Sequence, residues 1–164
     1  MQPRLNFANV APDAVRTMNG LEVFLRKSSG LEVSLLNLVR LRSSQMNGCA
    51  YCIDMHTKDA RASGETEQRL YTLSAWRETP FFTERERAAL FWTEHITLIS
   101  QEHVPDPVYE HVSQHFTGEA LVNLTLAVVA INGWNRLAIA FRAVPGEYQP
   151  LPAATAKSQA ALAE

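Results

Sequence analysis

One short run of the chain holds both of its cysteines and decides how the rest is interpreted: Asn47-Gly48-Cys49-Ala50-Tyr51-Cys52-Ile53-Asp54-Met55-His56. On a helix, Cys49, Cys52 and His56 are related by i, i+3 and i+7, so both sulfurs and the imidazole line one face. An Asn-Gly pair commonly ends a helix, and Asn47-Gly48 therefore predicts a break just before Cys49. The sequence thus predicts a helix over 49–62 that opens with two thiols and carries a base one turn later.

Patterns of helical period continue on both sides of this run. Thr83-Glu84-Arg85-Glu86 has the form of a capping box, Asp106-Pro107 that of an N-cap followed by proline, and Thr117 is expected to cap the last long helix. Alternation of period two is scarce, so we expect a single all-α domain with its helices packed around the cysteine-bearing one. The expected helices span residues 12–27, 31–46, 49–62, 65–77, 84–99, 106–116 and 117–142.

The composition shifts near the end of the chain. We expect the helical domain to comprise residues 1–142. Beyond it, proline, alanine and glutamine become frequent, which predicts an extended or disordered tail over 143–164.

Charge and hydropathy exclude several classes of partner and location. A net charge of −2 gives no basic surface for nucleic acid or for an anionic membrane. The most apolar stretch, 120–131, contains Asn123 and Thr125 and falls short of the ~20 residues that span a bilayer. The first residues lack the apolar core of a secretory signal. We therefore expect a cytoplasmic protein, in whose reducing compartment a CxxC pair is more often catalytic or metal-binding than structural.

The CxxCxxxH spacing favours thiol redox chemistry. A free cysteine titrates near pH ~8.5, and the thiolate is the reactive form. The start of a helix stabilises a negative charge, and His56 can accept the proton of Cys52. A second thiol three residues away can convert a sulfenic acid into a disulfide. The helix start favours Cys49 as the attacking thiol and the nearby base favours Cys52, so these arguments leave the choice open.

Two other interpretations of the cysteines compete with redox chemistry. The pair could hold zinc with His56 as third ligand, but zinc usually takes four ligands and the remaining histidines are distant in sequence. The two thiols could also be buried and inert. We favour the redox interpretation and expect no bound cofactor and no metal, only an external dithiol reductant.

For several other polar and aromatic residues we expect a structural role. The three tryptophans stand among apolar neighbours at helical spacing and are expected in the core or in a subunit interface. Asn132, Asn135 and Arg136 interrupt the apolar last helix, where we expect a polar network or a helix contact in an oligomer. His111 and His115 are expected to be a surface pair, because no further metal ligands stand near them in the sequence.

The segment 47–61, followed by Gly64-Glu65, closely resembles the alkyl hydroperoxidase D (AhpD)-like branch of the carboxymuconolactone decarboxylase superfamily. Supporting matches are Leu73-Ser74-Ala75-Trp76-Arg77-Glu78, 84–90 and Ile131-Asn132-Gly133-Trp134-Asn135-Arg136-Leu137, so that the resemblance covers about residues 20–142. It implies an all-helical protomer that forms homo-oligomers, often trimers or hexamers.

The resemblance also implies an activity and roles for the site residues. The expected function is an antioxidant, thiol-dependent hydroperoxide reductase that takes electrons from a dithiol donor protein. Cys52 would be the peroxidatic residue, Cys49 its proton donor and resolving partner, and His56 part of a proton relay. Decarboxylase members of the superfamily lack the cysteine pair, which argues here against lactone decarboxylation.

Two positions depart from the family's pattern. The relay glutamate twelve residues before the first cysteine is replaced by Asn37, whose amide cannot take up a proton near neutral pH. Tyr51 stands where the best-studied members have a histidine. Asn37 and Tyr51 are thus at most supporting residues, and Glu32, Asp54 and Asp59 are not at the matching position.

Because general base catalysis contributes ~100- to 10,000-fold, we expect weaker peroxidase activity than in relay-complete relatives. The departures also keep two alternatives open: a redox-responsive binding protein with little turnover, and a zinc-stabilised structural domain.

Overall fold

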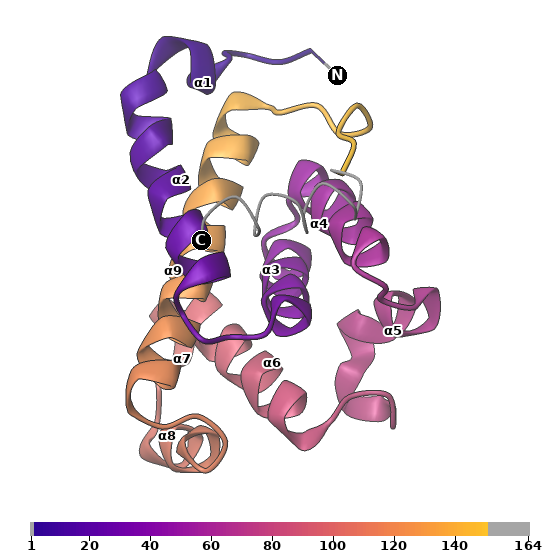
Figure 1. Ribbon diagram of the computed structural model, residues 1–164, viewed down its shortest axis with the longest axis vertical. Coiled ribbons are helices and arrows are strands. Elements are labelled where there is room, and N and C mark those ends of the chain that lie inside the picture. The colour runs from indigo at the N-terminus through magenta and orange to yellow at the C-terminus, as the bar shows by residue number, and fades with distance from the viewer. Residues whose placement is uncertain (1, 151–164) are drawn as a thin grey trace, which may run out of the picture.

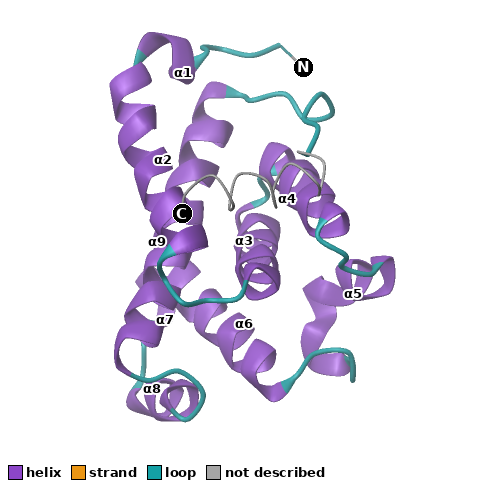
Figure 2. Cartoon of the chain, viewed as in Figure 1, coloured by secondary structure: helices purple, strands orange, loops and turns teal. Residues whose placement is uncertain are grey.

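The computed structural model describes residues 2–150, and every regular element in that range is helical (Figures 1 and 2). The all-α prediction is therefore confirmed. In chain order the elements are α1 (Phe7–Val10), α2 (Pro12–Lys27), α3 (Val33–Asn47), α4 (Ala50–Ala62), α5 (Glu67–Thr72), the 3-10 helix η1 (Leu73–Glu78), α6 (Glu84–Thr97), α7 (Ile99–Glu102), α8 (Asp106–Ser113) and α9 (Gly118–Phe141).

Helix α3 takes the central position, in place of the cysteine-bearing helix that we expected there. It packs against α4, α6 and α9 (Figure 1). Its Leu36 belongs to one apolar cluster, and its Leu38 and Leu41 belong to another. Most of α3 between Leu35 and Ser44 is buried, polar residues included, whereas in α4 only Cys52, His56 and Ala60 are buried. The cysteines accordingly lie at the edge of the core, between α4 and α9.

The break before the cysteines is confirmed and has a defined geometry. Gly48 ends α3 in the left-handed region at φ 67°, and its N–H donates to the carbonyl of Gln45. Glycine takes this conformation without a Cβ penalty, which is why the chain can turn there. Cys49 follows directly as the N-cap of α4.

Other helix boundaries match the sequence in part. The capping box of Thr83 and Glu86 is confirmed at the start of α6. The N-cap of α8 is Pro105 rather than Asp106, because Pro105 is still extended and the carboxylate falls in the first turn, where it faces the positive end of the helix. Thr117 holds the N-cap position of α9, but its side chain makes no capping hydrogen bond.

The helix expected over 65–77 divides in two. The α-helical part ends at Thr72, and a 3-10 turn with a kink at Ala75 follows. The guanidinium of Arg87 donates to the carbonyls of Trp76, Arg77 and Thr79, and these bonds hold the tight turn in place of regular α-helical bonds. The sequence pattern cannot show such a bond from another helix.

Helix α9 runs along the molecule beside α2 and α3 (Figure 1). It is 24 residues long and apolar enough to cross a membrane by length and composition, a test that the core helix of a soluble protein also passes. Buried Asn123, Asn132 and Asn135 are bonded to α3 and to the loop before it, so α9 is a core helix. Trp76 and Trp92 are also in the core, as predicted.

After α9 the chain turns back towards α4, as the yellow segment in Figure 1 shows. Its Gly146 and Tyr148 are hydrogen-bonded to side chains of α4. The first part of the predicted tail is thus packed on the domain, whereas 151–164 lies outside the described residues. The division at residue 142 stays a prediction.

Candidate functional site

Cys49 and Cys52 face each other across the first turn of α4. The sulfur of Cys49 caps the helix by accepting the backbone N–H of Cys52 at 3.4 Å. Both residues are only 1% exposed and pack with Ile131 and Ala138 of α9. Both are free thiols in this structure, at the spacing the sequence predicts.

The two sulfurs compete for one proton. The thiol of Cys52 donates to Cys49, and this bond, with backbone N–H groups of the first turn, lowers the pKa of Cys49 to about 7. The same bond and burial raise the pKa of Cys52. The first proton to leave the pair near neutral pH therefore comes from Cys49, and the remaining proton stays on Cys52.

A network of buried asparagines and hydroxyls supports the turn that carries the thiols. Asn47 donates to Asn132 Oδ1 at 3.0 Å and to Asn135 Oδ1 at 2.8 Å, and Asn135 donates to Ser44 Oγ at 3.0 Å. The Asn135 amide also acts on the sulfurs and lowers the pKa of Cys49. The predicted polar network is confirmed, and through Asn135 it extends to the thiols.

His56 lies one turn after Cys52 and is buried, at 6% exposure. Neither ring nitrogen has a hydrogen-bond partner among the described residues, so the expected direct bond to a thiol is not formed. Burial lowers the pKa of His56, against a nearby carboxylate that raises it. The imidazole is therefore neutral at pH 7 and keeps a free lone pair to accept a proton.

Charged side chains of α2, α3 and α4 act on His56. Asp59 Oδ2 lies 3.8 Å from its Nδ1, and the buried guanidinium of Arg40 acts on it from α3. Arg40 is paired with Glu22 Oε2 of α2 at 2.6 Å, and Glu22 Oε1 accepts the indole N–H of Trp134 at 3.1 Å. The sequence pattern assigned no role to Asp59 and did not single out Glu22.

The two supporting residues lie apart from one another. Tyr51 packs against the cysteine cluster, and burial raises the pKa of its hydroxyl. Asn37 is buried on α3 and lines a cavity of about 110 Å³ together with Ala60, one turn beyond His56 on α4. Within residues 2–150, no hydrogen bond joins Asn37 to a sulfur, and Asn37 is not among the groups that shift the pKa of either cysteine.

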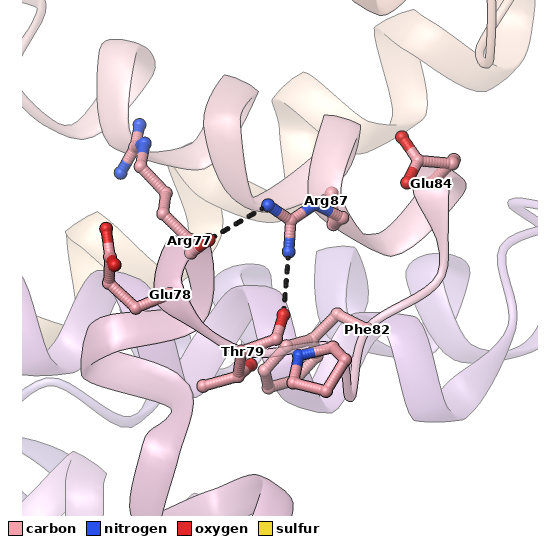
Figure 3. A pocket seen from close by; sticks show the side chains of 7 residues that line it. Arg77, Glu78, Thr79, Phe82, Glu84 and Arg87 are labelled. Carbon is pink, nitrogen blue, oxygen red and sulfur yellow. Dashed lines mark hydrogen bonds between the residues drawn. The ribbon is translucent and has the colours of Figure 1, made fainter.

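Two larger hollows lie away from the cysteines. One, of about 540 Å³, is lined by Arg77, Thr79 and Phe82, and Figure 3 shows Arg87 at its wall with its hydrogen bonds to Arg77 and Thr79. The other, of about 420 Å³, is apolar and lies between α2 and the end of α9. Within residues 2–150 no group of three or more His, Cys, Asp and Glu is arranged to hold a metal ion, so zinc finds no ligand set there.

Comparisons with known proteins agree with this fold. Residues 12–95 match the model of the carboxymuconolactone decarboxylase family, a range that contains both cysteines and His56. The chain is 46% identical to the uncharacterized protein YdfG of Bacillus subtilis over 140 residues, which cover 85% of this chain and 95% of YdfG.

Solved structures of other proteins share this fold. A protein of unknown function from Agrobacterium tumefaciens, provisionally assigned to antioxidant defence as AhpD, is 41% identical with a TM-score of 0.85, over 90% of this chain and all of that one. The debrominase Bmp8 matches with a TM-score of 0.76 at 19% identity, over 85% of this chain and 74% of its own, which is a likeness of fold alone.

Proposed function

The chain belongs to the carboxymuconolactone decarboxylase family, with an AhpD-like fold, and we propose that it is a thiol-dependent hydroperoxide reductase. The observation that carries the proposal is the paired thiol site: two free cysteines in the first turn of α4, joined by a hydrogen bond that lowers the pKa of one of them to about 7. The assignment of the related Agrobacterium protein to antioxidant defence agrees with it.

The proposed cycle has three balanced steps. A thiolate attacks the terminal oxygen of a hydroperoxide, the O–O bond breaks, and the alkoxide takes a proton, which leaves an alcohol and a cysteine sulfenic acid. The second cysteine then attacks this sulfur, expels water and closes a disulfide. An external dithiol, oxidised in turn to its own disulfide, returns both cysteines to thiols.

We assign the attack on the peroxide to Cys52 and the resolving role to Cys49. In the resting pair the proton is on Cys52, so Cys52 becomes nucleophilic when it passes that proton to Cys49. His56, neutral and with a free lone pair, accepts through a water molecule the first proton that leaves the thiol pair, and returns it to the hydroxide that is expelled as water when the disulfide closes. Cys49, once protonated, is placed to supply the proton that the departing alkoxide needs.

Burial of the sulfurs favours one other candidate function. Because both are only 1% exposed, a peroxide reaches them only when the surrounding chain opens. Slow access suits a redox-responsive binding protein, in which a disulfide changes an interaction and turnover is negligible. The likeness to the debrominase concerns the fold alone and gives no support for a halogenated substrate.

A peroxide-consumption assay with several dithiol donors tests the proposal. The wild type should consume hydroperoxide catalytically and lose two free thiols when the donor is omitted. Cys52→Ser should abolish consumption, whereas Cys49→Ser should react once and stop at the sulfenic acid. Stoichiometric oxidation without turnover for every donor would favour the binding protein, and full activity of Cys52→Ser would overturn the proposal.

The same proposal implies the partners, the oligomeric state and the location of the protein. The partners are a hydroperoxide substrate and a dithiol electron donor protein, and we expect a homo-oligomer, a trimer or hexamer, in the cytoplasm. We expect no cofactor and no metal, because the electrons pass from the external dithiol through the cysteine pair to the peroxide oxygen.

A further inference from the structure

Besides the thiols, one buried group of titratable side chains joins four parts of the chain. Its members are Glu22 of α2, Arg40 of α3, His56 and Asp59 of α4, and Tyr148 of the segment that follows α9. His56 is the member without a hydrogen bond among the described residues, although it is buried. Buried polar atoms are normally satisfied, and an exception calls for an explanation.

Asp59 is placed to orient that imidazole. The two residues are related by i, i+3 on α4, which puts them on one face of the helix. Oδ2 of Asp59 lies 3.8 Å from Nδ1 of His56, close enough that a small movement makes the hydrogen bond. A proton held on Nδ1 in this way leaves Nε2 as the basic nitrogen, and catalytic hydrogen bonds are often long in resting structures.

The segment after α9 fixes the carboxylate itself. The hydroxyl of Tyr148 donates to Asp59 Oδ1 at 2.6 Å, so one oxygen is occupied and the other is left to face His56. Lys58 holds this segment by donating to the carbonyls of Gly146 and Tyr148, both at 3.1 Å. The backbone N–H of Gly146 adds a bond of 3.0 Å to Asp54.

We propose that Asp59, held by Tyr148, is the positioning residue that fixes the tautomer of His56 and makes it a base for the thiol pair. The inference rests on the proposed function, since it assigns the base of that same site. It gives this chain a Cys–His–Asp arrangement along a single helix, with cysteine, base and orienting carboxylate at positions 52, 56 and 59.

The remaining charges near His56 set how strongly it attracts a proton. Arg40 on α3 disfavours the imidazolium, while Asp59 on α4 and Glu22 on α2 favour it. Arg26 of α2 acts on Asp59 and Arg40, and the Tyr148 hydroxyl is neutral near pH 7 because burial and the neighbouring carboxylate raise its pKa to about 12. Since Glu22 is bound to Arg40, the two largely cancel, and Asp59 is the carboxylate that decides the protonation of the imidazole.

The test measures His56 directly. In the full chain, the proton NMR signal of His56, assigned by its loss in His56→Gln, is titrated in the wild type and in Asp59→Asn. The amide keeps the size of the side chain and removes its charge, so the pKa of His56 should fall further below its usual value. The matched control is Asp54→Asn, which removes a carboxylate of the same helix that also holds the C-terminal segment but does not act on His56; its titration should stay as in the wild type.

A kinetic readout separates this inference from the proposed function. Asp59→Asn, whose amide oxygen can still accept from Tyr148, should slow alkylation of the thiols by iodoacetamide about tenfold at pH 7, with a changed pH profile. Tyr148→Phe leaves the charge of Asp59 in place and should change the His56 titration less than Asp59→Asn does. Neither measurement uses peroxide, so both remain informative if the protein proves inactive as a peroxidase. An unchanged His56 titration and an unchanged alkylation profile in Asp59→Asn, with the fold intact by circular dichroism, would overturn the inference. An equal change in Asp54→Asn would do the same, because anchoring of the segment would then explain both.

Discussion

Asn135 is fully buried in α9, and both the oxygen and the nitrogen of its side-chain amide make hydrogen bonds. Its Oδ1 accepts from Asn47, while its Nδ2 donates to Ser44, and the amide also lowers the pKa of Cys49. A donor fixed in this way stabilises a thiolate without having to reorient when the charge forms. The reactivity of a cysteine at the start of α4 thus depends on a residue more than 80 positions away in the sequence.

The change Asn135→Ala should make the thiol pair less acidic. In the wild type the pKa of Cys49 is lowered to about 7, so the rate of alkylation should rise with pH around that value. Without the amide the midpoint should move upwards, and alkylation at pH 7 should slow about two- to threefold. Because Asn47 and Ser44 also lose a partner, the free energy of unfolding should fall by about 1–3 kcal/mol.

A second asparagine of α9 provides the control. Asn123 is also buried and donates to the carbonyl of Ser29, far from the cysteines along the helix. Asn123→Ala should lower the free energy of unfolding by a similar amount and leave the pH profile of alkylation unchanged. If both variants shift the profile equally, loss of stability explains the shift, and the role of Asn135 at the thiols is refuted.

At the level of elements, the turn between α3 and α4 decides where the cysteines lie. Gly48→Ala forces a Cβ into a conformation at φ 67° and should lower the free energy of unfolding by about 1–2 kcal/mol. Gly20→Ala is the matched change, inside α2 with open space around it, and should raise the free energy of unfolding by about 0.5–1 kcal/mol. Urea unfolding measures both, and effects of the same sign would show that the left-handed turn does not determine the outcome.

Local sequence patterns predict the helix boundaries that depend on bonds within one turn. Asn47-Gly48 locates the start of α4, and the capping box at Thr83 locates the start of α6, because both signals act within one turn. The 3-10 turn after Thr72 could not be predicted, since it is held by Arg87 from another helix. Sequence patterns describe bonds between near neighbours, and this one spans two elements.

The candidate site likewise contains residues that the sequence could predict and residues that it could not. Cys49, Cys52 and His56 could be found because helical spacing alone puts them on one face of α4. Glu22 and Tyr148 could not, because each reaches the site from a distant part of the chain. Tyr148 also stands in a proline-rich stretch that predicted no packing, and only the contacts with Asp59 and Lys58 show its place.

At the level of the whole molecule, the cysteines are enclosed by segments from distant parts of the chain. Ala143, just after α9, packs against the cysteine cluster, and the segment 143–150 then crosses to α4. Lys58 is the point where this segment is held, because its ammonium group binds Asp54 and two backbone carbonyls together. Most of α3 is buried, whereas no residue of 143–150 is, so this segment is expected to open more easily than the helices around the cysteines.

Loosening this segment should therefore expose the thiols without unfolding the domain. In Lys58→Met the carbonyls of Gly146 and Tyr148 lose their shared donor, and alkylation of the native protein should become several-fold faster. The midpoint of urea unfolding should change little, because the lost bonds lie at a partly exposed surface. Lys27→Met, at the exposed end of α2, removes the same charge elsewhere and should leave the rate unchanged. Equal rates in the two variants would mean that the sulfurs are reached by another route, such as separation of α4 from α9, and alkylation would then follow the global stability of the protein.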